Sequence, residues 1–145
     1  MVLEFIRLPV CWKRLTPPME PRLAAYAARP REVVDAEWQF LRAARLHGFH
    51  TVNGWPRQTN AAYERAVAAR NVLRTLPDRG QRFLLGCLAD SDLSVVSWAA
   101  FYLLPYRERA AVRALKRVAL SDTFLIGLGA ETTLEEWRAG RLTVE

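Results

Sequence analysis

Residues that commonly carry chemistry are scarce in this chain, whose 145 positions include only two cysteines, two histidines and two lysines. Cys11 and Cys87 form no C-x-x-C pair and are too few for a zinc site. We therefore expect reduced thiols, a cytoplasmic protein and no cofactor. His47 and His50 lie three positions apart, but Gly48 stands between them and no further ligand is close in sequence. No metal site is predicted.

Long apolar runs are also missing. The longest stretch without a charged residue, Leu93 to Tyr106, has 14 residues, whereas a membrane-spanning helix needs about 20. Near the N-terminus, Glu4 and Pro9 interrupt the apolar residues, and no small-residue cleavage site follows, so the segment does not resemble a signal peptide. These absences predict a globular protein without a membrane span.

Positive charge is present but uneven. Residues 1–89 carry a net charge of +7 and residues 90–145 a net charge of −1. Almost all of the basic residues are arginines, whose guanidinium groups suit paired hydrogen bonds to carboxylates or phosphates. The surplus favours an acidic protein surface or a polyanion as partner, and a solvated arginine face is the plain alternative.

Apolar residues recur at helical spacing through most of the chain. We expect one domain over residues 1–145, with an N-terminal arm at 1–16 whose structure the pattern leaves open. Residues 17–79 are expected to hold N-terminal helices around a loop at 48–56. The predicted bounds of these helices are about 19–29, 31–47 and 59–76.

Helix 59–76 has a predicted inner face and a predicted outer face. Its outer face is expected to present Arg65, Arg70 and Arg74 to solvent. Its inner face is expected to comprise Tyr63, Val67, Ala68 and Leu73. The segment Pro77 to Gly80 is expected to end this helix.

Residues 80–145 contain the clearest internal order. The dipeptide Ser91-Asp92 recurs as Ser121-Asp122, 30 positions later, and each stands where a helix N-cap is expected. Gly140 is expected to end the last helix, and Gly127 and Gly129 to allow close helix packing. The predicted helices form two pairs, about 80–89 with 93–104 and about 106–119 with 123–139. Such pairs bury their apolar faces only by stacking, which predicts an all-α fold, a short right-handed solenoid of antiparallel helix pairs.

The stretch from Asp92 to Leu104 resembles the second helix of a HEAT-type repeat, in which Asp, Val, Ala-Ala and Leu recur. Asp92, Val95, Ala99, Ala100 and Leu103 match that pattern. Residues 80–142 further resemble small bacterial HEAT-like proteins of unknown function, some of which look like immunity proteins encoded beside toxins. The resemblance implies a HEAT-like, cytoplasmic, non-enzymatic protein that binds another protein, such as a cognate toxin with an acidic surface, and occludes its active site.

Partner-binding candidates come from aromatic and basic residues. Trp55, Trp98 and Tyr102 are the kind of aromatic residues that dominate protein interfaces, although the pattern favours core positions for Trp98 and Tyr102. Helix 106–119 leaves a basic stripe, which comprises Arg109, Arg113, Lys116 and Arg117. A solvated face is the alternative for the stripe.

Nucleic acid is the alternative partner, through phosphate contacts that salt would weaken. The arginines available for it besides the basic stripe are Arg42, Arg45, Arg65, Arg70 and Arg74.

Catalytic patterns are weak. Neither histidine has a serine or cysteine nucleophile at a recognised spacing, and the G-x-G at Gly127 follows no predicted strand. Glu131 and Glu135 share a helical face, but an ion pair with Arg138 explains them better than acid–base chemistry. We predict no catalytic residues and no enzyme activity.

Overall fold

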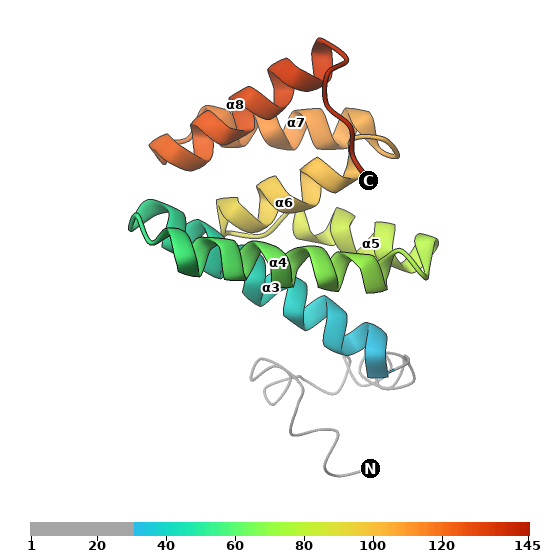
Figure 1. Cartoon of the computed structure of the whole chain (residues 1–145). Helices are drawn as coiled ribbons and strands as arrows, with labels where there is room; N and C mark the ends of the chain where they lie inside the picture. Colours follow the sequence, from blue (N-terminus) through green and yellow to red (C-terminus); the bar gives the residue numbers. More distant parts are fainter. Residues whose placement is uncertain (1–30) are drawn as a thin grey trace, which may run out of the picture. The chain divides into compact units, whose positions relative to one another are not determined.

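A computed structural model describes residues 31–145, so the predicted arm at 1–16 and helix at 19–29 lie outside the described residues. Residues 35–145 form one compact unit. In the described part every regular element is an α-helix, which confirms the all-α prediction (Figure 1). The helices are α3 Arg31–Val52, α4 Pro56–Leu73, α5 Pro77–Cys87, α6 Leu93–Leu103, α7 Glu108–Ala119 and α8 Phe124–Arg138.

Helix α6 is the centre of the core in residues 35–145. It packs against α5 and α7, α7 packs against α8, and α6 also contacts α8 (Figure 1). Leu103, Leu104 and Val118 are completely buried at these contacts. Cys87 at the end of α5 is buried as well, and burial raises the pKa of its thiol to about 12, so the predicted reduced thiol is unreactive at neutral pH.

The predicted loop at 48–56 is wrong, because α3 continues through Gly48 to Val52. A Cβ at Gly48 would lie 2.5 Å from the Cβ of Ser94, so this glycine allows α3 to contact the start of α6. There the Ser94 hydroxyl donates a hydrogen bond of 2.7 Å to the carbonyl oxygen of Ala44. Glycine at this position therefore serves packing inside a helix and does not mark a turn.

The predicted inner face of α4 is confirmed at Leu73, which is buried, and is wrong at Tyr63 and Ala68, which are exposed. The helix buries Ala62, Ala66 and Ala69, while Tyr63 is 52% exposed. Small residues at this spacing allow a close helix contact, and the larger side chains flank it. Arg70, expected in solvent, is buried in the same face with 4% of its surface exposed.

Several helix boundaries differ from the predicted ones because of proline. Pro56 and Pro77 occupy the first turns of α4 and α5, where the missing N–H costs no helical hydrogen bond. The segment Pro77 to Gly80 therefore begins α5 and does not end α4. Gly80 lies against the end of α4, since a Cβ there would be 2.6 Å from the carbonyl oxygen of Leu73.

The two predicted N-caps have different outcomes. Asp92 caps α6, accepting a hydrogen bond of 2.8 Å from the backbone N–H of Ser94. At the recurring dipeptide the prediction is wrong, because Thr123 is the N-cap of α8 and makes no side-chain cap bond.

Glycines near α8 also differ in role. Gly140 ends α8 as predicted, with φ at +68° and backbone hydrogen bonds back to Trp137 and, through Arg141, to Glu136. The close-packing role of Gly129 is wrong, because a Cβ there would meet nothing within 4 Å. Gly127 is buried within ordinary contact distance of α7.

Candidate functional site

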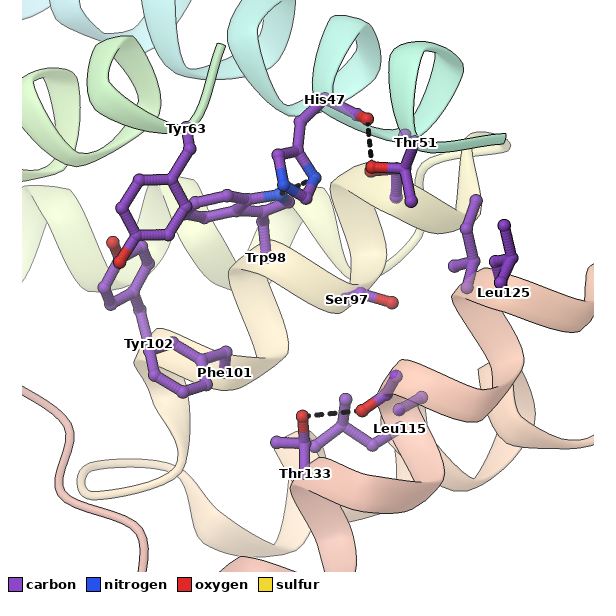
Figure 2. Close-up of a pocket in the computed structure, with 15 residues that line it drawn as sticks. His47, Thr51, Tyr63, Ser97, Trp98, Phe101, Tyr102, Leu115, Leu125 and Thr133 are labelled. Carbon is purple, nitrogen blue, oxygen red and sulfur yellow. Dashed lines mark hydrogen bonds between the residues drawn. The ribbon is translucent and has the colours of Figure 1, made fainter. Parts of the chain in front are cut away.

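A functional candidate is a cavity of about 370 Å³ between α6 and α8, with one end formed by α3 and α4 (Figure 2). We call it the aromatic groove. Its aromatic wall comprises His47, Tyr63, Trp98, Phe101 and Tyr102. The facing wall belongs to α8 and comprises Leu125, Ile126, Gly129, Ala130 and Thr133.

Ring contacts hold the aromatic wall together. Trp98 is at the centre, with ring centroids 5.2 Å from His47, 5.4 Å from Tyr63 and 5.9 Å from Tyr102. The His47 and Trp98 rings meet edge to face at 87°, a favoured arrangement for aromatic pairs. Because these rings lie on three different helices, folding itself assembles the wall.

His47 is a neutral hydrogen-bond acceptor in this wall. Its Nδ1 accepts a hydrogen bond of 3.3 Å from the indole Nε1–H of Trp98, which requires that nitrogen to be unprotonated. Burial, with a smaller contribution from the charge of His50, lowers the pKa of His47. Both effects favour the neutral imidazole.

Hydroxyl groups supply the remaining polar atoms of the groove. Thr133 donates to the carbonyl oxygen of Gly129 at 2.8 Å, and Thr51 donates to that of His47 at 2.7 Å (Figure 2). The Ser97 hydroxyl is buried without a hydrogen-bond partner. His47 therefore does not activate Ser97 as a nucleophile, and the groove is suited to binding apolar groups around one free hydroxyl.

Large apolar side chains remain exposed beside the lining residues of α3 and α8. Val52 at the end of α3 is 53% exposed. At the start of α8, Phe124 is 77%, Leu125 is 44% and Leu128 is 47% exposed. We call these four residues the apolar rim. Exposed apolar side chains gathered near a cavity are typical of an interaction site.

Of the three aromatic residues predicted to bind a partner, two line the aromatic groove and one does not. Trp98 and Tyr102 both line the aromatic groove, and Tyr102 is also nearly buried. Trp55 is outside the lining and packs at the turn after α3, 5.8 Å from the ring of Phe49 and 5.6 Å from that of His50.

The basic stripe is exposed on α7 and contributes no residue to the groove. Arg117 is partly engaged, because it donates a hydrogen bond of 2.6 Å to the carbonyl oxygen of Leu88. The four basic residues, Arg109, Arg113, Lys116 and Arg117, thus share a helix but do not join the aromatic wall.

Sequence reasoning missed His47, Tyr63 and the α8 wall as parts of one site. The sequence signal for this site was the aromatic face of helix 93–104. That face forms a pocket only together with residues of other helices, which the sequence pattern did not identify. The predicted ion pair is also corrected: Arg141, not Arg138, forms the ion pair of this segment, at 2.7 Å from Glu136.

Within residues 31–145 no group of three histidine, cysteine or acidic residues could hold a metal ion. Across the same range, no helix combines the length and apolar character needed to cross a membrane. Comparisons with protein-family models, curated proteins and solved structures found no match to the chain.

Proposed function

We propose that this chain is a cytoplasmic, non-enzymatic, HEAT-like protein whose aromatic groove binds an apolar segment of another protein. The observation that carries the proposal is the open cavity of about 370 Å³, lined by aromatic rings and flanked by the apolar rim. Burying the rim and the rings on a partner would remove apolar surface from water, which is the main driving force of association.

A protein partner explains both the cavity and the exposed apolar rim beside it, whereas a small ligand explains only the cavity. A small molecule would fill the cavity and leave Phe124 and Leu128 exposed, whereas a protein segment would cover them. The absence of a hydrogen bond to Ser97 also gives the groove no activated nucleophile. The basic stripe on α7 would steer an acidic partner toward the molecule.

The narrower proposal is that the partner is a bacterial toxin. It is supported by the resemblance of residues 80–142 to small bacterial HEAT-like proteins, some of which look like immunity proteins. In this proposal the helices stack as a short right-handed solenoid, and the chain neutralises the toxin by covering its active site.

Nucleic-acid binding is a weaker alternative, because one of the arginines it needs is buried and another is paired with an aspartate. Arg70 is buried, and Arg45 forms an ion pair of 3.1 Å with Asp90. Binding through the remaining arginines would fall steeply as salt rises.

The test is to measure binding of the purified chain to each product of its neighbouring genes by calorimetry. Leu125→Asp places a charge in the groove, while Leu120→Asp makes the same change at a site 86% exposed and outside the lining. We expect Leu125→Asp to weaken binding by about tenfold or more, equivalent to ~1.4 kcal/mol, and Leu120→Asp to have little effect.

Equal binding by both variants would contradict the groove as the docking site. If no neighbouring product binds, the toxin proposal fails. Salt-sensitive binding to DNA or RNA would instead favour the alternative.

A further inference from the structure

Arg70 is a buried cation that has no counter-ion among residues 31–145. Only 4% of the residue is exposed, and its Nη1 has no hydrogen-bond partner. Its guanidinium carbon lies 4.6 Å from the ring centroid of Tyr102, a cation–π contact. Within residues 31–145 no carboxylate forms an ion pair with it. Burying an arginine without a paired anion is costly, so the position calls for a functional explanation.

A second cavity, of about 320 Å³, adjoins this guanidinium. We call it the arginine cavity, and it is distinct from the aromatic groove although Tyr102 contributes to both. Arg70 and Arg74 form its α4 side, Gln81 comes from α5, and Tyr106 follows α6. Among the described residues, 31–145, no acidic side chain lines this cavity.

The start of α5 adds positive potential near the arginine cavity, and Asp78 in the first turn of that helix partly offsets it. Helix α5 begins at the edge of the cavity with Pro77, and the N-cap residue Leu76 supplies no side-chain acceptor. The first N–H groups of a helix attract anions when no side chain caps them. Two arginines one turn apart also repel each other. Burial and the charge of Arg74 together lower the pKa of Arg70, although arginine stays charged in proteins.

We propose that the arginine cavity binds a carboxylate or phosphate group of a small molecule, with Arg70 as its main hydrogen-bond donor. An oxyanion there would neutralise the two arginines and compensate for the burial of the Arg70 guanidinium. The volume lies at the small end of the range for ligand pockets, about 300–1,000 Å³, and so fits a small molecule. Leu73 and Leu84 give the cavity apolar walls for the rest of that molecule. This site goes beyond the proposed function and does not depend on it.

The test measures thermal unfolding of the full chain in sodium benzoate, inorganic phosphate or chloride at equal ionic strength. We expect benzoate or phosphate to raise the Tm above that in chloride, by an amount that grows with the logarithm of anion concentration. A larger rise with benzoate indicates a carboxylate ligand, and a larger rise with phosphate indicates a phosphate ester.

Two arginine variants on α4 make the test specific. Arg70→Met keeps the aliphatic stem but removes the donors, so its Tm should be the same in all three salts. Arg65→Met removes an exposed arginine of the same helix and should respond like the wild type. The proposal is overturned if neither anion acts more strongly than chloride, or if Arg70→Met responds fully.

Arg70→Lys covers the case in which Arg70→Met does not fold. It retains a positive charge but lacks the planar pair of donors. We expect calorimetry to show at least about tenfold weaker binding of the more effective anion, equivalent to ~1.4 kcal/mol. Unchanged affinity would overturn the role assigned to the Arg70 guanidinium.

Discussion

The two sides of α6 differ in what covers them. One side is completely buried by the rest of the chain. Its residues, each 0% exposed, are Val95, Val96, Ala99, Ala100 and Leu103. Ser97, Trp98 and Phe101 keep part of their surface exposed and line the aromatic groove. A helix that is apolar all round can therefore be buried in the core on one side and line an open groove on the other.

The largest expected effect contrasts one residue from each side. Leu103→Ala should lower the free energy of unfolding by about 2–5 kcal/mol, because it opens a void in a closed core. Phe101→Ala removes a larger side chain but only enlarges a groove that is already open, so its loss should be smaller. Urea denaturation measures both, and an equal or larger loss for Phe101→Ala would break the comparison.

The second prediction contrasts two helical glycines. Gly48→Ala forces a Cβ against Ser94, and overpacking of this kind typically costs about 1–3 kcal/mol. Gly129→Ala, in the groove wall, meets no atom within 4 Å and should gain up to about 1 kcal/mol of helix propensity. Thermal unfolding of the two variants should shift in opposite directions. A Gly48→Ala protein as stable as Gly129→Ala would mean that α3 and α6 are not in close contact.

The third prediction concerns the N-cap of α6, the helix that carries both the buried side and the groove side. Asp92→Ala removes the acceptor for the N–H of Ser94 and should cost about 1 kcal/mol, within a usual range of ~0.5–2 kcal/mol. Asp92→Asn keeps the acceptor and serves as the control. The measurement is the free energy of unfolding in urea. Equal values for the Asp92→Ala and Asp92→Asn variants would show that the cap does not contribute to stability.

The smallest expected effect is a pH dependence from the aromatic groove. The pKa of His47 in the folded chain is lower than its ordinary value of 6.5, so the unfolded chain binds the proton more readily. The free energy of unfolding should therefore be unaffected by His47 above pH 6.5. It should decline as the pH falls from 6.5 toward the lowered pKa of His47.

Replacement of His47 by glutamine keeps a polar side chain and should remove this decline. The measurement is the free energy of unfolding between about pH 7.5 and 5, spanning the ordinary histidine pKa. The same slope in the wild type and His47→Gln would contradict a neutral, buried His47.

Sequence patterns predicted the fold where local chemistry decides it. The apolar run at 93–104 and its Asp92 cap specify α6, and Gly140 specifies the end of α8, because these signals act within one helical turn. Expectations were wrong where distant residues decide the outcome. The sequence around Gly48 predicts a turn, whereas the structure shows that this glycine makes room for Ser94 of α6.

The candidate site was predictable only in part for the same reason. Trp98 and Tyr102 stood out by residue type, but their groove exists only because α8 and the end of α3 face them. On α4, periodicity favoured the large Tyr63 as an inner residue, whereas the helix buries its alanines and Arg70. No local pattern distinguishes an alanine face made for close packing from a solvated one.

The most direct test of protein recognition by the aromatic groove is amide hydrogen exchange of the chain with and without its bound gene-neighbour product. We predict slower exchange on binding at the start of α8 and the end of α3, where the apolar rim would be covered. Protection confined to the basic stripe on α7, with the groove unchanged, would contradict the account.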